Sequence, residues 1–283
     1  MLQGRPVSSN ATGSPLQAAS SATQRRRLSL GAISIDPLTF AEALDAICDL
    51  CARGEGGSVV TPNVDHVVQA EHDPRFRGAY DRASLSLVDG MPLLWAARLL
   101  GEPLPAKISG SDLVMPLLGR AAERGLRVYL LGVAEGVAAL AAEKMKEKHP
   151  SLIIAGIDSP LVDISGGEAG YAPIVAKVRA AKADLVLLAL GAPKQEIFAD
   201  DCAAALRPAV CVGVGATLDF IAGKSQRAPR WMQRVGLEWL HRLLQEPGRL
   251  WRRYLLRDPE FAVIVLRTLL RRRAARRSAA ISP

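Results

Sequence analysis

The chain has 283 residues, 49% of them hydrophobic, so it can bury the core of one large domain or of one domain with an appendage. Its formal net charge is +8. No run approaches the roughly 20 apolar residues of a membrane span, and the N-terminus lacks the apolar segment of a secretory signal, so we expect a soluble or peripheral protein.

The charge is unevenly distributed. Residues 227–283 carry 14 arginines against 4 acids, a net charge of +10, while residues 1–27 carry 4 arginines and no acid. Residues 28–226 therefore have a net charge of −6. A mildly acidic body with a basic C-terminal end requires an anionic partner for that end, and a lipid surface, a phosphate-bearing substrate or a nucleic acid would each provide one.

The four cysteines do not form the pattern of a disulfide framework or a zinc site. Cys48 and Cys51 fall inside a helical pattern, with no second pair or histidine at zinc spacing. We interpret them, with Cys202 and Cys211, as small buried apolar residues in a reducing compartment.

Strand and helix patterns alternate between about residues 28 and 220. Residues 1–27, rich in Ser, Ala and Gln, are predicted to be a disordered tail. A first strand is predicted over 28–35, and Thr39 is the expected N-cap of a helix over 40–52. Strands are predicted at 58–60, 85–88, 127–132, 151–157, 183–191 and 209–214. Helices are predicted at 64–71, 74–83, 91–100, 113–124 and 171–181, and a further helix follows Gly136 and ends at residue 148. The order predicts an α/β domain over 28–222, with a Rossmann-like, mostly parallel sheet flanked by helices.

Polar residues follow at least four of these strands. They are Thr61 with Asn63, then Asp89, Gln195 and Asp219. In a parallel sheet these strand ends lie on one edge, where α/β proteins place ligand groups. Four such ends favour a binding site, although Asp89 precedes a glycine and a turn or cap role for it stays open.

Two loops are candidates for binding phosphate. The loop Lys107-Ile-Ser109-Gly-Ser-Asp112 offers hydroxyl and backbone N–H groups before a helix. Gly132 and Gly136 stand between a strand and a helix, whose N-terminus attracts phosphate. Their spacing is not that of the dinucleotide fingerprint, which argues against an NAD site.

From residue 223 the sequence mixes Trp, Leu and Arg at helical spacing, and the chain as a whole resembles a known family. It is similar to the WecG/TagA/CpsF family of bacterial glycosyltransferases over about 28–257. Six blocks in order carry the resemblance: Thr61-Pro-Asn63, Val88-Asp-Gly-Met-Pro92, Lys107–Asp112, Leu190–Glu196, Gly213–Phe220, and Arg227-Ala-Pro229 with the motifs that follow it to Tyr254.

The resemblance implies transfer of a sugar from a UDP-sugar to a sugar on a polyprenyl diphosphate, in the synthesis of cell-surface polysaccharide. The family reaction is inverting and uses no metal or other cofactor. The transferred sugar is N-acetylmannosamine, its uronic acid or glucose. The protein would act in the cytoplasm, peripherally on the inner face of the plasma membrane. The resemblance also implies a homo-oligomer in solution, whose packing competes with folding of the C-terminal tail over the site.

The resemblance also implies roles for single residues. Asp89 corresponds to the proposed base, and Thr61, Asn63 and Gln195 to pocket residues. Lys107 departs from the family pattern, which usually has Arg there. Lysine keeps the charge but loses the bidentate fork.

Elementary chemistry agrees with these roles. An inverting transfer needs a base for the acceptor hydroxyl and positive charge or N–H donors for the leaving diphosphate. Asp219, which can equally be a structural residue, and His66 are rival bases to Asp89. Candidate diphosphate ligands are Lys107, Ser109, the Gly132 turn, Arg227, Arg249 and Arg252. No Asp-x-Asp motif occurs, so the usual ligands of metal-dependent glycosyltransferases are missing.

Residues 223–283 are predicted to form a basic, amphipathic helical appendage that associates with an anionic membrane. Its apolar run over 261–266 is too short to span a bilayer and is followed by arginines, so it should lie in the interface. Ordinary domain core or an oligomer contact is the alternative for these helices. A non-enzymatic nucleic-acid-binding protein is the alternative function, but tryptophans set among Leu and Arg suit a membrane interface better than base stacking, and no nucleic-acid partner is expected.

Overall fold

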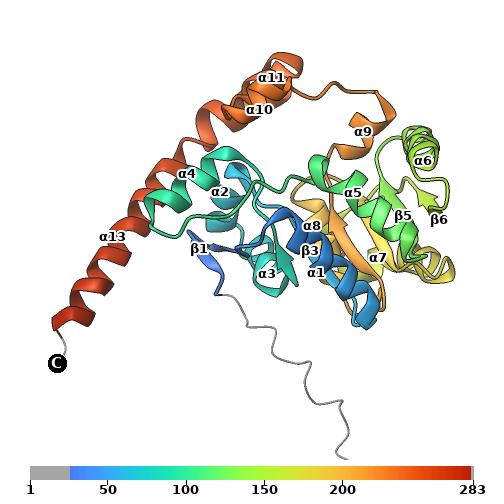
Figure 1. Ribbon diagram of the computed structural model, residues 1–283, viewed down its shortest axis with the longest axis horizontal. Helices are drawn as coiled ribbons and strands as arrows, with labels where there is room; N and C mark the ends of the chain where they lie inside the picture. The colour runs from blue at the N-terminus through green and yellow to red at the C-terminus, as the bar shows by residue number, and fades with distance from the viewer. Residues whose placement is uncertain (1–25, 282–283) are drawn as a thin grey trace, which may run out of the picture.

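The computed structural model describes residues 26–281, apart from the side chains of Glu168 and of 276–281. All but the last two residues of the predicted disordered tail lie outside this range. A six-stranded parallel sheet in the order β4-β3-β8-β7-β5-β6 forms the centre of the fold (Figure 1). Its strands are β3 (Gly57–Val60), β4 (Leu85–Ser86), β5 (Arg127–Gly132), β6 (Ile153–Asp158), β7 (Leu185–Ala189) and β8 (Val210–Gly213). The predicted Rossmann-like α/β fold is confirmed.

Helices connect the strands and cover both faces of the sheet. They are α1 (Phe40–Arg53), α2 (Val64–His72), α3 (Pro74–Arg82), α4 (Met91–Leu99), α5 (Gly110–Glu123), α6 (Val137–Lys148), α7 (Gly167–Ala180), α8 (Lys194–Asp201) and α9 (Thr217–Ala222). The predicted cap of α1 is confirmed: Thr39 and Glu42 form a reciprocal capping box, and the helix ends at Gly54 with a left-handed backbone.

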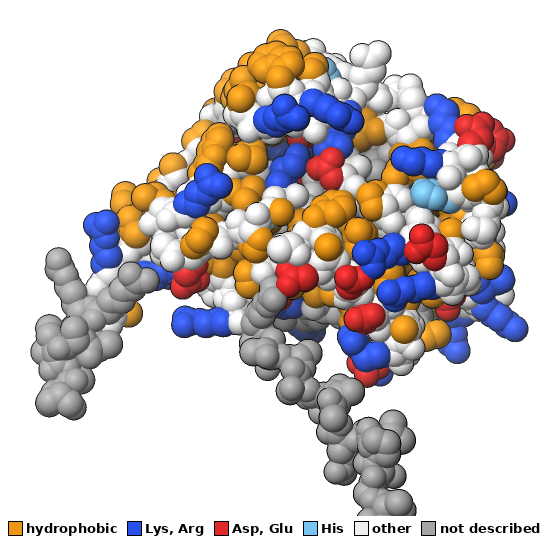
Figure 2. Space-filling view, in the orientation of Figure 1, with side chains coloured by type: hydrophobic (Ala, Val, Ile, Leu, Met, Phe, Trp, Pro, Cys, Tyr) orange, Lys and Arg blue, Asp and Glu red, His pale blue; other side chains and the backbone are white. Residues whose placement is uncertain are grey.

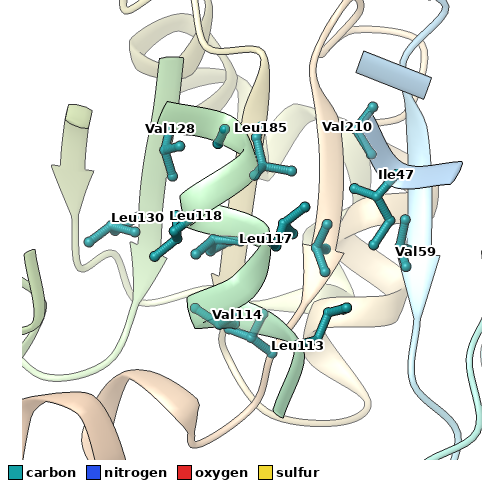
Figure 3. Packing of buried hydrophobic residues seen from close by; sticks show 14 of the residues in the cluster. Ile47, Val59, Leu113, Val114, Leu117, Leu118, Val128, Leu130, Leu185 and Val210 are labelled. Carbon is teal, nitrogen blue, oxygen red and sulfur yellow. The ribbon is translucent and has the colours of Figure 1, made fainter. Parts of the chain in front are cut away.

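Burial of β7 on both faces follows from its continuous apolar sequence. Leu185 and Leu187 pack with α1 and α5 in one cluster, whereas Val186 and Leu188 pack with α7 and α8 in another. Figure 3 shows α5 side chains such as Leu117 lying over the strands. Alternate residues point to opposite faces, so a strand buried on both sides must be apolar throughout. The four cysteines are buried, as predicted.

The prediction of a single strand over 28–35 is wrong. β1 (Leu28–Leu30) and β2 (Ile33–Ile35) form a separate antiparallel hairpin. Gly31 turns the chain with φ 59°, a conformation that glycine adopts without steric cost. Alternating apolar residues on both sides of this turn fit one long strand or two short ones, so the alternation alone does not show the turn.

The C-terminal helices pack against the body. They are α10 (Arg230–Arg234), α11 (Glu238–Gln245), α12 (Pro247–Arg252), a π-helical turn η2 (Arg253–Arg257) and α13 (Glu260–Ile281). Figure 1 shows α13 running along the side that carries α2, α4 and β1. Its Ile264 and Val265 are buried in the same cluster as Leu30 and Val67. Within residues 26–281, no helix has both the length and the apolar character needed to cross a membrane.

Candidate active site

The parallel sheet brings the predicted polar strand ends to one edge. Thr61 and Asn63 follow β3, Asp89 follows β4, Gly132 ends β5, Gln195 lies in the first turn of α8, and Asp219 lies in α9 after β8. Neighbouring strands are about 4.8 Å apart, so β4 and β5, four steps apart in the sheet, are separated by roughly 19 Å. The edge is therefore long enough to hold an extended ligand.

A cavity of about 350 Å³ opens at the β3–β4 end of this edge. Asn63, Asp89 and Lys107 line it from the body. The C-terminal segment supplies most of the other wall: Gln233, Gly236, Glu238, Trp239, Arg242, Arg253, Tyr254, Asp258, Pro259 and Phe261. The cavity is thus formed jointly by the end of the parallel sheet and by helices that follow it much later in the chain.

Asp89 is held in place by its backbone. Its N–H donates to the carbonyl of Pro62 at 2.8 Å, and Gly90, with φ 110°, turns the chain into α4. Burial, and then the negative charge of Glu238, raise the pKa of the Asp89 carboxyl to about 6, while Lys107 and Arg242 oppose the rise. Such a carboxyl is ionised at neutral pH yet retains proton affinity, as a general base requires.

Lys107, Ser109 and Arg227 lie together beside Asp89's cavity in a network with two carboxylates. Lys107 Nζ is 3.6 Å from Asp112 Oδ2 and 3.6 Å from Glu238 Oε2. Arg227 Nη1 is 2.7 Å from Asp112 Oδ1, and Arg227 Nη2 donates to Ser109 Oγ at 3.3 Å. Burial acts against ionisation of Asp112, but hydrogen bonds from Arg227 and Ser109 lower its pKa to about 2. The two cations are therefore charge-balanced before any ligand binds.

Asn63 connects α2 to the C-terminal segment. Its Oδ1 accepts from the backbone N–H of His66 at 3.3 Å and from Arg253 Nη2 at 3.2 Å. His66 itself is buried, with Nδ1 2.7 Å from the Tyr80 hydroxyl and Nε2 3.4 Å from Asn63 Nδ2. Burial lowers the pKa of His66 to about 3, so the ring is neutral. These contacts suit a role for His66 in orienting Asn63 rather than a role as the general base.

Thr61 and Gln195 are buried behind the sheet edge rather than at the cavity wall. Thr61 Oγ1 donates to the carbonyl of Gly213 at 3.4 Å. Gln195 Oε1 accepts from the N–H of Gly215 at 3.1 Å, and its Nε2 donates to Glu196 at 2.8 Å. Thr61 thus holds the last residue of β8, and Gln195 holds the loop that follows this strand, in the middle of the sheet edge.

The model of the Glycosyl transferase WecG/TagA/CpsF family matches residues 28–275. The chain belongs to this family. It is 34% identical over 215 residues to an N-acetylglucosaminyldiphosphoundecaprenol N-acetyl-β-D-mannosaminyltransferase of Bacillus spizizenii strain W23, covering 76% of this chain and 80% of that protein. A protein of the same name from Bacillus subtilis strain 168 is 32% identical over 213 residues, covering 75% of this chain and 80% of the relative. The chain is accordingly an enzyme, a glycosyltransferase.

For this WecG/TagA/CpsF glycosyltransferase, two of the predicted tail residues lie away from the cavity. Arg249 is exposed and pairs with Glu246 at 2.6 Å, and Arg252 lies over the ring of Trp251. The arginines that line the cavity are Arg242 and Arg253 instead. Spacing could have indicated Arg242, four residues after Glu238 and hence on the same helix face. The position of Arg253 depends on the π-helical turn, which leaves no clear signal in the sequence.

Gly132 and Asp219 are not lining residues of the cavity. Gly132, with φ 106°, ends β5 where a Cβ would come within 2.7 Å of the backbone of Ala189. Asp219 lies in the first turn of α9. Within the described residues, no three His, Cys, Asp or Glu side chains are grouped so that they could hold a metal ion.

Proposed function

We propose that this glycosyltransferase moves N-acetylmannosamine from its UDP-sugar to N-acetylglucosamine on a polyprenyl diphosphate, with inversion and without a metal. N-acetylmannosaminuronic acid and glucose are the alternative donor sugars. The names of the two Bacillus relatives support the first donor and this acceptor. The observation that carries the proposal is the Asp89 carboxyl in a cavity that also contains Lys107, Arg242 and Arg253.

The chemistry is a single displacement. Asp89 accepts the proton of the acceptor hydroxyl. The hydroxyl oxygen attacks the anomeric carbon of the donor from the face opposite the UDP. The bond from that carbon to the diphosphate oxygen breaks, and UDP leaves with the electron pair. Lys107 and Arg242, which line the cavity, would balance the developing negative charge, and this electrostatic support is a main source of rate enhancement at such sites.

The donor fits along the sheet edge. Gly132 and the N-terminus of α6 lie at the β5 end, and the positive end of a helix dipole suits phosphate or the nucleotide. The sugar would then reach towards Asp89 at the β4 end. The loop after β8, held by Gln195, would lie under the middle of the ligand.

A membrane role for the C-terminal segment belongs to the same proposal. Figure 2 shows apolar side chains gathered over α10 and α11 and along α13, with Lys and Arg among them. The exposed apolar side chains of the C-terminal segment include Trp231, Leu244, Leu255, Leu256, Val263, Leu266 and Leu270. Such a surface suits peripheral binding to the anionic inner leaflet, where a lipid-linked acceptor would be presented.

The test is a transfer assay with the full chain, UDP-N-acetylmannosamine and an N-acetylglucosaminyl-diphospho-polyprenol in anionic vesicles. We expect UDP release that depends on the acceptor, continues in EDTA, and gives a product of inverted configuration by NMR. Release without acceptor, loss of activity in EDTA, or retention of configuration would each contradict one part of the proposal. A donor panel containing the uronic acid and glucose nucleotides decides the sugar.

A further inference from the structure

Asp65 is a buried carboxylate next to the site that the catalytic scheme does not use. It lies in the first turn of α2, two residues after Asn63, and its side chain is only 4% exposed. Two arginines of η2 reach it: Arg253 Nε lies 3.4 Å from Asp65 Oδ2, and Arg257 Nη2 contacts Asp65 Oδ1 directly. A buried charge requires such partners, because taking it out of water without them is strongly unfavourable.

The two arginines differ in what else they do. Arg253 donates to Asn63, approaches Asp258 at 4.0 Å and lines the cavity. Arg257 is 46% exposed and is not a lining residue; its ion pair among the described residues is with Asp65. A change at Arg257 therefore tests the attachment of η2 to the body without altering the cavity wall directly.

The attachment of η2 to Asp65 also places neighbouring residues of the chain at the cavity. Tyr254 on this turn and Asp258 directly after it also line the cavity, and the ring centroid of Tyr254 lies 5.8 Å from that of Trp239 on α11. A π-helical turn is rare and is frequently found at functional sites. Fixing both arginines of this turn to one carboxylate fixes where its other side chains face the cavity.

The ion pairs that hold α13 to the body do not have this effect on the cavity. Glu71 on α2 lies 3.9 Å from Arg267, and Glu102 lies 3.1 Å from Arg272. Both pairs hold α13, and none of the four residues lines the cavity. Glu71 is thus a matched control: an acid of the same helix, paired with an arginine of the same C-terminal segment.

We propose that Asp65 is a positioning residue for the sugar transfer: by holding Arg253 and Arg257 it sets η2 against the cavity and completes its wall. The kinetic part of this inference rests on the proposed function; the structural part does not. The expected consequence of its loss is a cavity in which Arg253, Tyr254 and Asp258 are displaced while the α/β body is intact.

The experiment compares Asp65→Asn, Arg257→Gln, the double variant and Glu71→Gln in the full chain. We expect kcat with the lipid-linked acceptor to fall on the order of 10- to 100-fold in the first two, the scale of a misplacement of about 1 Å. The double variant should be no worse than Asp65→Asn alone, because both changes break one attachment. Affinity for UDP should change by less than about twofold, since UDP is placed at the other end of the edge.

Hydrogen exchange supplies the readout that does not depend on activity. Peptides covering 247–258 should exchange faster in Asp65→Asn and Arg257→Gln than in Glu71→Gln, with peptides of the sheet unchanged. Unchanged exchange and wild-type kcat in Asp65→Asn, or additive losses in the double variant, would overturn the proposal. If Asp65→Asn fails to fold, Arg257→Gln decides by itself. A wild-type chain that transfers no sugar would contradict the proposed function, and the exchange data would still decide the role of Asp65.

Discussion

At the scale of single residues, the chemistry depends on the pKa that the surroundings of Asp89 give to its carboxyl. The carboxyl follows a two-residue strand and is partly buried beside Glu238, which raises its pKa to about 6. Lys107 and Arg242 keep it from rising further. The same burial that makes Asp89 basic enough to accept a proton also makes its ionised form costly, so activity and stability should respond to this residue in opposite directions.

Replacing Asp89 by Asn should reduce turnover by about 100-fold or more, the usual scale for loss of a general base, while UDP still binds. In the wild type, kcat/KM should fall as the pH drops below about 6, because protonated Asp89 has no proton acceptor to offer. The measurement is a pH profile of UDP release for both proteins. Near wild-type turnover in a folded Asp89→Asn variant would remove Asp89 as the base, and Asp219 would be tested next.

The same variant should be more stable than the wild type near neutral pH. Because the folded-state pKa lies above the unfolded value of 3.8, this carboxyl favours folding below pH 3.8 and loses that contribution as the pH rises through about 6. Asn has no such loss, so the gain at pH 7.5 is at most about 3 kcal/mol. Thermal melts at pH 7.5 and pH 4 check it: a rise in Tm of equal size at both pH values would contradict the argument.

At the scale of elements, alternating strand and helix patterns predicted the fold because the central strands β7 and β8 are buried and apolar over their whole length. β7 is the clearest case, since its two faces enter different clusters. The strand ends predicted that Asn63 and Asp89 lie on one edge, and the loop before α5 predicted Lys107 near them. The prediction missed Arg253, because its direction depends on the break at Pro247 and on the turn η2. It also missed Arg242, although the spacing from Glu238 places both residues on one face of α11.

The β1–β2 hairpin, unseen in the alternation, has a packing role that can be tested. A Cβ on Gly31 would lie 2.7 Å from Glu71 Oε1 and 2.7 Å from Ile264 Cγ2, and its φ of 59° is unfavourable for other residues. Gly31→Val should therefore destabilise the protein by about 2–4 kcal/mol, from strain and from displacement of α13. Gly170→Ala, in helix α7 with open space around it, is the control and should be neutral or slightly stabilising.

Denaturant unfolding of both variants measures these differences. A Gly31→Val protein as stable as the wild type would show that the hairpin and α13 separate without cost. In Gly31→Val, hydrogen exchange should become faster than in the wild type in α13 and stay unchanged in the sheet, because the added side chain meets Ile264 of α13.

At the scale of the whole molecule, the C-terminal segment has two sides. Ile264 and Val265 close a cluster with the hairpin and α2, while Leu255, Leu256 and Val263 face outward. Deleting residues 223–283 would therefore uncover core as well as remove the outer surface, and its effect on membrane binding could not be separated from damage to the fold. Point changes on the outer surface separate the two roles.

The double change Leu255→Ser with Leu256→Ser should weaken binding to anionic vesicles by about tenfold or more while Tm stays near that of the wild type. Both side chains are more than half exposed, so the folded protein loses little, whereas each apolar side chain that inserts into the interface contributes to membrane affinity. Leu161→Ser is the matched control: Leu161 is fully exposed but precedes α7, away from the basic C-terminal segment. Vesicle co-sedimentation at low and high salt is the measurement, and binding should weaken with salt because the arginines act through the surface potential. If Leu161→Ser weakened binding as much as the double change, or if the double change had no effect, the outer surface of residues 231–270 would not be the membrane contact.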